Sequence, residues 1–369
     1  MRIVITTTLN DNLFYAKLVP LLRSRPDIEL VVVSDRQGPA YDRVRWVRPH
    51  GITAAFGRLG GRLLLLMREI LNPRTRLVMA YNLVPHGMFA IAIGHLAGKP
   101  VWVHYIAGPA EIRFAHNPDV TDNRLITTSK NPARLERMAR RFGLKADKVF
   151  VPGSKTAGFL AKEGYDSKRV VKLHSTVDLA RYYSTDATRE FEVLISAQLR
   201  PRKRPKFTLE VLREVLRQRP DARFCWLGDG PMHDEFESLI DEYGLRSHLT
   251  WTETNQVSGY YRKAKVFLLC SINEGLSLAC MEAMGCGMVP VASDCGDMSE
   301  VVRNGETGRL LPVEAPVEDY AKAVLSFLDD KTRWASCSQA ASELIRREHS
   351  FESAIAEWQK LLAPFDKRT

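Results

Sequence analysis

Two acidic side chains, Glu274 and Glu282, stand eight residues apart around a turn that joins an apolar segment (266–271) to a helical segment. Backbone N–H groups at the start of a helix attract an anion, and Gly275 lets a phosphate approach the backbone closely. Glu282 falls on the first turns of the helix, within reach of hydroxyl groups on the same ligand. Such a loop suits a phosphate attached to a polyhydroxylated body, and a nucleotide-sugar fits that description.

Short β-branched segments alternate with helical patterns along almost the whole chain, which is typical of a doubly wound α/β protein. The strand series restarts near residue 191, after a polar connector, so we expect two Rossmann-like domains joined near residue 180. In such sheets ligands bind beyond the carboxyl ends of the strands, and a site for two substrates usually lies between domains. The predicted strands are 2–8, 28–34, 77–81, 101–106, 125–128, 148–151 and 170–173, then 193–197, 223–227, 249–252, 266–270, 289–293 and 309–311.

The composition is that of an ordinary globular protein. A chain of 369 residues, with 45% hydrophobic and 26% charged residues, is long enough for two domains. No segment has the uninterrupted apolar length that spans a bilayer, and the first residues have the pattern of a strand instead of a secretory signal. We therefore expect a cytoplasmic protein. None of the six cysteines has the spacing of a zinc site, so we expect buried, reduced thiols.

The formal net charge of +10 indicates an anionic partner. Nucleic acid is not expected, because the chain has no recognition-helix signature, no basic tail and no platform of interleaved aromatic and basic residues. A phosphorylated substrate and an anionic membrane surface are the other candidates. The segments 134–148 and 58–68 combine basic and apolar residues and could meet lipid. A solvated basic face and a buried helix are the respective alternatives.

Three segments resemble the family-4 glycosyltransferases, which are retaining enzymes of the GT-B fold. The strongest match is 274–308, which also carries Gly-Met-Val-Pro at 287–290, Gly296 and Asn304-Gly305. The segment 193–204 looks like the strand and loop that hold the donor diphosphate in the family. The segment 175–178 sits where the family has its interdomain Asn-Gly-Val-Asp turn. The resemblance implies an α/β protein of GT-B architecture, with two Rossmann-like doubly wound domains facing across a cleft.

The resemblance also implies domain roles. Residues 1–180 would form the acceptor domain, and residues 181–350 would form the nucleotide-sugar donor domain. The final helix, within about 351–369, would pack back on the acceptor domain. Lys203 would bind the donor phosphates and Glu274 would hold the sugar, while His104 looks like the first-domain histidine near the transferred sugar. These three are the predicted catalytic residues.

The predicted donor-binding set is larger, and Glu282 within it would bind the ribose. Thr252 and Glu253 fall where family members contact the base, and the backbone of the turn after Glu274 would hold the phosphate. The full set is Gln198, Lys203, Arg204, Thr252, Glu253, Gly275, Leu276, Ser277, Glu282 and Asn12.

The sequence departs from the family pattern at four places. Gln198 replaces an arginine, so one positive charge near the diphosphate is missing, and Arg204 replaces a glycine and could restore that charge. Thr176 replaces the glycine of the interdomain turn. The first strand leads to a loop in which Asn10 or Asn12 offers amides, where the family has paired glycines.

We expect a metal-independent transfer without a cofactor, with a UDP- or GDP-linked sugar as the substrate. Lys203, helped by Arg200, Arg202 or Arg204, could stabilise the leaving diphosphate, and one such preorganised donor is worth about 3–4 kcal/mol in a transition state. The predicted function is a retaining glycosyltransferase acting on a glycan or lipid-linked acceptor in surface polysaccharide or glycolipid biosynthesis, in the cytoplasm or on the inner face of the cell membrane. The alternatives are a nucleotide-sugar epimerase of the same fold and a non-catalytic scaffold that binds sugar nucleotides.

Overall fold

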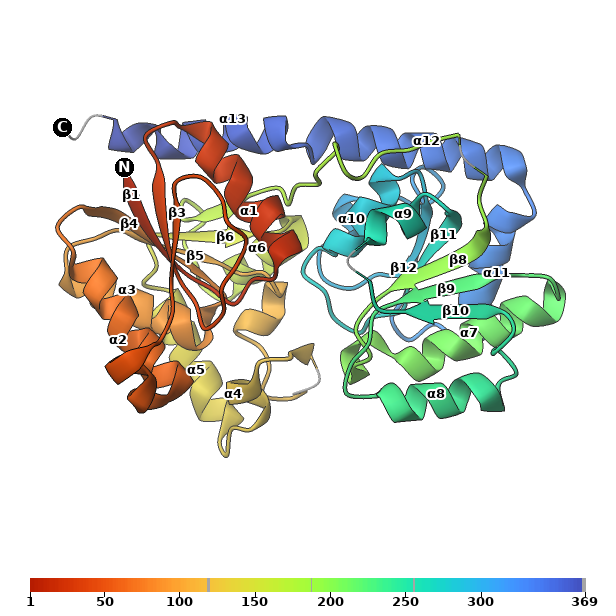
Figure 1. Ribbon diagram of the computed structural model, residues 1–369, viewed down its shortest axis with the longest axis horizontal. Helices are drawn as coiled ribbons and strands as arrows, with labels where there is room; N and C mark the ends of the chain where they lie inside the picture. The colour runs from red at the N-terminus through yellow and green to blue at the C-terminus, as the bar shows by residue number, and fades with distance from the viewer. Residues whose placement is uncertain (118–119, 187, 255, 367–369) are drawn as a thin grey trace. The chain divides into compact units, whose positions relative to one another are not determined.

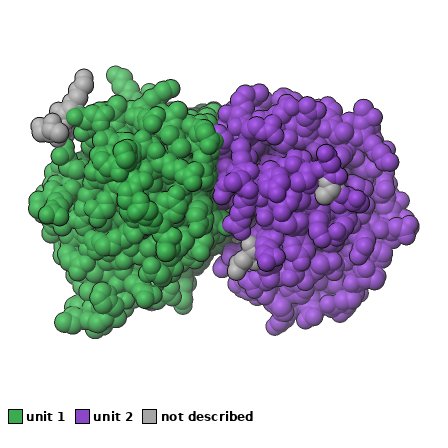
Figure 2. All heavy atoms as spheres, turned by 45° about the horizontal axis from the view of Figure 1, so that its top comes forward, with its two compact units in different colours: residues 1–176, 351–369 green, residues 177–350 purple. Residues whose placement is uncertain are grey.

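The computed structural model describes residues 1–117, 120–186, 188–254 and 256–366, and Figure 1 shows its helices and strands. The chain divides into two compact units, coloured separately in Figure 2. Unit 1 comprises Met1–Thr176 and Phe351–Thr369, and unit 2 comprises Val177–Ser350. The sequence analysis places the first boundary at residue 180 and the second at 350. Residues 367–369 of the predicted C-terminal segment lie outside the described residues.

Unit 1 is built on a parallel sheet of seven strands in the order β3-β2-β1-β4-β5-β6-β7. The direction of winding reverses between β1 and β4, so the carboxyl ends of these two strands form the switch point at which doubly wound sheets bind ligands. The strands are β1 (Arg2–Thr6), β2 (Glu29–Val33), β3 (Val44–Val47), β4 (Thr75–Tyr81), β5 (Val101–His104), β6 (Lys148–Val151) and β7 (Val170–Lys172).

Helices cover both faces of this sheet. One apolar cluster joins alternate strand residues to α2 and α3, and a second joins the opposite face to α1 and α13. The helices are α1 (Asp11–Ser24), α2 (Gly57–Leu71), α3 (Met88–Leu96), α4 (Arg124–Thr127), α5 (Pro132–Gly143), α6 (Ser154–Lys162) and α13 (Phe351–Leu362). Short helical turns are η1 (Gly51–Phe56), η2 (Leu83–Gly87), η3 (Gly108–Glu111) and η7 (Ala363–Phe365).

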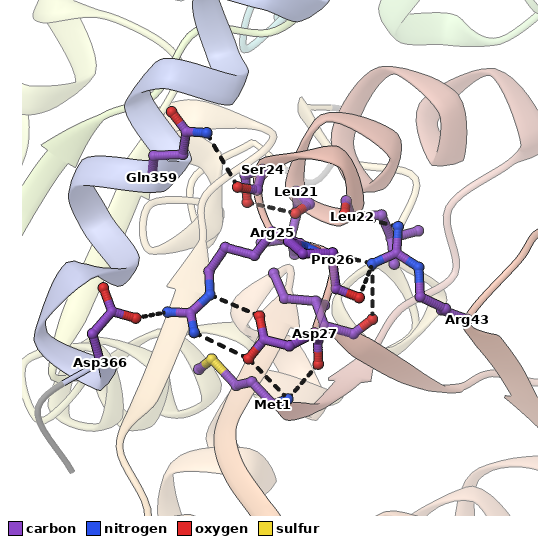
Figure 3. Close-up of polar contacts among 11 residues, drawn as sticks. Met1, Leu21, Leu22, Ser24, Arg25, Pro26, Asp27, Arg43, Gln359 and Asp366 are labelled. Atoms are coloured by element: carbon purple, nitrogen blue, oxygen red, sulfur yellow. Dashed lines mark hydrogen bonds and ion pairs between the residues drawn. The ribbon is translucent and has the colours of Figure 1, made fainter. Parts of the chain in front are cut away.

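The last helix belongs to the same core as the first strands, although more than 300 residues separate them in the sequence. Trp358 of α13 is buried in the α1 face of the sheet. Polar contacts hold the two ends of the chain together (Figure 3): the Gln359 amide donates to the Ser24 carbonyl at 3.3 Å, and Arg25 forms an ion pair with Asp366. The helix α13 is therefore part of unit 1, and its apolar side chains are buried in the core of that unit.

Two local predictions in unit 1 are wrong. Residues 125–128, predicted as a strand, lie in and just after the short helix α4, because the Asn123 side chain accepts a hydrogen bond from the Leu125 N–H at 3.1 Å and caps the turn. The edge strand β3, at Val44–Val47, was not predicted.

Unit 2 contains a parallel sheet of six strands in the order β10-β9-β8-β11-β12-β13, with its switch point between β8 and β11. The strands are β8 (Phe191–Ser196), β9 (Phe224–Leu227), β10 (Leu249–Thr252), β11 (Ala264–Leu269), β12 (Val289–Ser293) and β13 (Arg309–Leu311). Helices α7 (Pro205–Gln218), α8 (His233–Glu242), α9 (Val257–Tyr261), α10 (Leu278–Gly285), α11 (Val317–Leu328) and α12 (Lys331–Glu348) surround it, with turns η5 (Pro201–Lys203) and η6 (Met298–Glu300).

Each face of the unit 2 sheet packs against its own apolar cluster. All six cysteines lie in unit 2, where they are buried and unpaired, as the sequence analysis expects. Within the described part of the chain, no helix is both long enough and apolar enough to cross a membrane.

Candidate functional site

The predicted donor residues of unit 2 gather at the carboxyl edge of its sheet. The loop that carries Lys203 follows β8, and the turn that carries Glu274 follows β11, so the two segments leave adjacent strands at the switch point. The backbone joins them directly, because the Ile272 N–H donates to the Arg202 carbonyl at 2.9 Å. The sheet topology therefore explains why residues 71 positions apart meet.

Glu274 and Lys203 form a nearly buried ion pair. The Lys203 ammonium donates to the Glu274 carboxylate, and the two side chains are 11% and 10% exposed. The Arg202 Nη1 lies 3.8 Å from the same carboxylate oxygen. Burial raises the pKa of the Glu274 carboxyl, but the charges of Lys203 and Arg202 outweigh burial and hold that pKa below its ordinary value. The site therefore contains an ionised carboxylate and two cations.

The turn after Glu274 presents unused backbone donors. Ser277 caps α10, because its hydroxyl accepts from the Cys280 N–H at 3.4 Å. The N–H groups of Gly275 and Leu276 donate to no acceptor within the described residues. Since the N-terminus of a helix also carries a partial positive charge, this turn can receive an anion.

A second loop fixes the shape of this turn. The Asp297 N–H donates to the Gly275 carbonyl at 2.7 Å. Gly296 has a φ of +52°, and a Cβ at this position would lie only 1.9 Å from the Glu274 carbonyl oxygen. A side chain at residue 296 would therefore collide with the backbone that positions Glu274, so glycine is required here.

Glu282 is buried within α10 and is 5% exposed. Burial raises the pKa of its carboxyl to about 8, and the neighbouring Tyr182 and Arg181 offset only part of that effect. In the unliganded protein Glu282 is therefore mostly protonated at neutral pH. The hydroxyl-binding role that the sequence predicts for this residue would require it to lose its proton.

The other predicted donor residues in unit 2 differ in their contacts and exposure. Gln198 follows β8 and accepts a hydrogen bond from the Arg200 Nε at 3.1 Å. Thr252 ends β10, at the same edge of the sheet, and Glu253 is exposed just beyond it. The structure therefore brings the segments after β8, β10 and β11 to one edge.

Arg204 has a left-handed backbone with a φ of +51°, which explains why glycine suits this position in the resembling family. Its guanidinium carbon lies 3.6 Å from the centre of the Phe207 ring, and its Nη1 donates to the Val313 carbonyl at 2.7 Å. Among the three arginines that could assist Lys203, the structure places Arg202 beside Glu274 and uses Arg204 in contacts with α7 and the segment after β13.

The two predicted residues of unit 1 have different surroundings. His104 is buried between two aromatic rings, with ring centres 4.1 Å from Tyr81 and 4.5 Å from Phe150. Burial, together with the charge of Lys17, holds the pKa of His104 well below its usual range, so the imidazole is neutral. These are the surroundings of a packed core side chain. Asn12 is partly exposed on the first turn of α1, just after β1.

Comparisons with known proteins agree with this organisation. Residues 184–344 match the model of the family described as glycosyl transferases group 1. The sulfoquinovosyl transferase SQD2 of Arabidopsis thaliana is 29% identical over 168 residues, which cover 42% of this chain and 32% of that protein. The D-inositol 3-phosphate glycosyltransferase of Rhodococcus jostii is 24% identical over 309 residues, which cover 76% of this chain and 66% of that protein. These alignments thus span from one third to two thirds of the relatives' length.

Solved structures show the same architecture at low sequence identity. The sucrose-phosphate synthase of Thermosynechococcus elongatus matches over the full length of both chains with a TM-score of 0.78 and 15% identity. The HepE protein of Anabaena, solved with UDP-glucose, matches 99% of this chain and 100% of its own with a TM-score of 0.76 and 14% identity. The expected fold, a GT-B architecture of two Rossmann-like units, is confirmed.

Proposed function

We propose that this chain, whose residues 184–344 match the glycosyl transferases group 1, transfers a sugar from a nucleotide-sugar to a glycan or lipid-linked acceptor. The Glu274–Lys203 pair beside the unused amides of Gly275 and Leu276 is the observation that carries this proposal. Cations and amides suit a diphosphate, and a carboxylate suits sugar hydroxyls. The donor is UDP- or GDP-linked; HepE, solved with UDP-glucose, supports the first.

A thermal-shift panel of nucleotide-sugars tests the donor site. A ligand present at a hundred times its dissociation constant stabilises a protein by about 2.7 kcal/mol, so the correct donor raises the melting temperature clearly. The effect should disappear when Lys203 is replaced by methionine. A panel without any stabilising nucleotide-sugar, or stabilisation that survives this substitution, would contradict the assignment.

We propose a retaining reaction that requires no metal ion. Lys203, Arg202 and the amides of the α10 turn would stabilise the leaving diphosphate, as preorganised donors do in a site of low dielectric constant. The acceptor hydroxyl would attack from the face that the diphosphate leaves, and the departing phosphate would take the acceptor proton. Glu274 would then position the sugar, and the anomeric configuration of the product, read by NMR, tests the stereochemistry.

Donor affinity is expected to depend on pH through Glu282. Its carboxyl must be ionised to accept hydrogen bonds from two ribose hydroxyls, but its pKa is about 8 before the donor binds. We therefore expect the dissociation constant of the donor to fall about tenfold between pH 7 and pH 9, since one pKa unit is a factor of ten in protonation. Isothermal titration calorimetry at several pH values measures this change, and Glu282→Gln should abolish it.

The same carboxyl affects folding in the opposite direction. Its pKa in the folded protein is raised above the ordinary value of 4.5, so its contribution to stability is fully present below pH 4.5 and is lost as the pH rises through about 8. The prediction for donor affinity has a clear contrary outcome. If the donor affinity of Glu282→Gln keeps the pH dependence of the unsubstituted protein, a group other than Glu282 titrates.

We propose that unit 1 docks on an anionic membrane surface through the side formed by α2, α3, α4 and α5. Twelve large hydrophobic side chains are exposed among the described residues; eleven of them lie on these helices or beside them, and the twelfth is in unit 2. Helix α3 packs against both α2 and α5 (Figure 1). The eleven residues are Ile52, Phe56, Leu59, Leu64, Met67, Leu71, Phe89, Leu96, Leu125, Met138 and Leu144.

Charge supports the same partner. Residues 51–146 contain fourteen Lys and Arg against five Asp and Glu, so they hold nearly all of the net charge of +10. Three of the five acids (Glu69, Glu111 and Glu136) are buried. A surface of apolar side chains among unbalanced basic ones suits the boundary between lipid headgroups and acyl chains.

Removing two charges from this surface should weaken membrane binding. Each basic residue near an anionic bilayer contributes about 1 kcal/mol, so the double variant Arg134→Gln/Arg137→Gln should lower the partition coefficient about thirtyfold. Flotation with vesicles containing phosphatidylglycerol at low salt measures it. Arg213→Gln/Arg217→Gln on α7 removes equal charge from unit 2 and should leave flotation unchanged. Equal flotation with neutral and anionic vesicles would remove the membrane proposal.

The role in the cell that we propose is surface polysaccharide or glycolipid biosynthesis at the cytoplasmic face of a membrane. Relatives named for such steps include the lipopolysaccharide core biosynthesis mannosyltransferase LpsB of Rhizobium meliloti, which is 27% identical over 243 residues, covering 62% of this chain and 68% of that protein. An epimerase would convert the donor without an acceptor, and a scaffold would bind the nucleotide without turnover. Product analysis with and without acceptor distinguishes the three.

A further inference from the structure

A second polar cluster lies at the carboxyl edge of the unit 1 sheet, outside the donor site. Its residues come from four segments around the switch point between β1 and β4. Asp35 and Arg36 follow β2, His86 lies in η2 directly after β4, and Arg62 reaches the cluster from α2. Thr6 ends β1 on the face of the sheet that α2 and α3 cover. None of these residues belongs to the catalytic or donor-binding set that the sequence predicts.

Arg62 is the most unusual member of this cluster, because its guanidinium is buried and Asp35 is the one acidic neighbour that the described residues give it. The residue is 3% exposed, and its Nη1 lies 3.6 Å from the Asp35 Oδ1, which is too long for a good hydrogen bond. The same Asp35 is held more closely by the exposed Arg58, at 2.7 Å. Burial lowers the pKa of Arg62 to about 10, so the group remains charged at neutral pH.

The edge of Arg62 that faces away from Asp35 lacks partners. Both Nε and Nη2 are buried, and within the described residues neither has a hydrogen-bond acceptor. These two nitrogens form the fork with which an arginine binds a carboxylate or phosphate through two parallel hydrogen bonds. Burying charged donors without acceptors is costly, so this fork is expected to meet an anion that the unliganded chain does not supply.

Other unused polar atoms occur in the same cluster. Within the described residues, His86 Nδ1, Arg36 Nε and Thr6 Oγ1 also have no hydrogen-bond partner. His86 is 9% exposed, and burial together with the charge of Arg62 lowers its pKa to about 3, so it is a neutral imidazole that can donate one hydrogen bond. The Asp35 and Arg36 side chains are 20% and 41% exposed, and Arg36 also forms an ion pair with the exposed Asp11 through its Nη2.

We propose that Arg62, with Arg36, His86 and Thr6, binds the phosphoryl group of a phosphorylated acceptor. A phosphoryl group presents three oxygens that accept hydrogen bonds from several directions, and unused donors at this edge of the sheet come from α2, β1 and the segments after β2 and β4. The identification of the bound molecule as the acceptor rests on the proposed function. The phosphate site itself is inferred from the contacts in unit 1 and does not depend on that function.

Phosphate binding can be measured in the whole chain without any sugar transfer. In the Lys203→Met background, which removes the main phosphate ligand of the donor site, inorganic phosphate should still raise the melting temperature relative to chloride at equal ionic strength. The expected shift is about 2–4 °C at ten times the dissociation constant. Adding Arg62→Gln should abolish it. Adding Arg68→Gln, which removes an exposed arginine from the same helix, should preserve it.

Two outcomes would overturn the proposal: no shift in Lys203→Met, or an equal shift after Arg62→Gln. If Arg62→Gln does not fold, Arg36→Gln should weaken phosphate binding at least threefold, and unchanged binding there would count against the site. Crystals soaked in tungstate should show anomalous density at Arg62 Nε and Nη2, and density at Lys203 alone would contradict the inference.

The source of the phosphoryl group is distinguished by two probes. Glycerol 3-phosphate represents a soluble phosphomonoester, and short-chain phosphatidylglycerol represents a lipid phosphodiester. Whichever probe shifts the melting temperature in an Arg62-dependent way identifies the kind of acceptor, and an Arg62-dependent response to neither would overturn the acceptor assignment. If sugar transfer is never observed but phosphate binding is, the proposed function fails and this site stands.

Discussion

Lys203→Met is expected to lower kcat about a hundred- to a thousand-fold. Lys203 is one of two cations beside Glu274, and no other described residue places its charge on that carboxylate at hydrogen-bonding distance. If this ammonium stabilises the leaving diphosphate, its removal costs about 3–4 kcal/mol in the transition state, as the loss of one preorganised donor does elsewhere. Initial rates with the donor found by the thermal-shift panel measure the effect.

The matched control is Lys206→Met. Lys206 is exposed on the first turn of α7, three residues along the chain, and its substitution removes the same charge from the same segment. Its kcat should remain within a factor of two or three of the unsubstituted protein. If both variants lose activity equally, the basic segment acts only through its total charge, and the specific role of Lys203 is refuted.

Glu274→Ala is expected to destabilise unit 2 by about 3–5 kcal/mol, which is the usual cost of removing one partner of a buried ion pair. The substitution leaves the nearly buried Lys203 side chain beside Arg202 without the carboxylate that both cations contact. The loss should be largest near neutral pH. Because the pKa of Glu274 is depressed, its contribution to stability is present above the ordinary pKa of 4.5 and is lost as the pH falls through the folded value.

A double-mutant cycle tests the cause of this loss. Lys203→Met/Glu274→Ala removes both charges together, so it should be less destabilised than the sum of its two single variants and should show a coupling energy of 0.5–3 kcal/mol in urea unfolding. If the effects of the two substitutions simply add, the pair contributes no interaction energy. Glu274 would then stabilise the turn only through its backbone contacts with residues 296 and 297.

The sequence predicts most of the fold, because parallel strands buried on both faces give strong apolar signals. Twelve of the thirteen strands that the described residues form were predicted, and the final helix, predicted within about 351–369, spans Phe351–Leu362. The missed strand β3 lies at a sheet edge and is only four residues long, and it carries Arg45, whose guanidinium binds Glu69 at 2.8 Å. Three of the four residues of the segment 125–128 are β-branched, but only Ile126 in it is buried, so the local hydrogen bonds of the capped turn decide its conformation.

Only part of the polar sites could be predicted from the sequence. Residues were found when they belong to a local motif, and were missed when they come from segments that are distant along the chain. Glu274 and Lys203 are found together because each sits in a dense local motif that follows a strand. By contrast, Asp35, Arg62 and His86 come from three separate segments, and none of those segments has a motif, so only the folded chain reveals the cluster. The stacking of His104 between Tyr81 and Phe150 also depends on tertiary packing that no local pattern encodes.

The return of α13 to unit 1 has a consequence for how this protein can be made. On the ribosome, the first 176 residues emerge long before Phe351, Trp358 and Leu362, so the part of the α1 face that α13 covers stays bare while the whole second unit is translated. Exposed apolar surface on a nascent chain promotes aggregation, so we expect chaperones to bind it. A fragment that stops at Thr176, or a product cut by a protease before Phe351, would keep that apolar face permanently exposed and would aggregate.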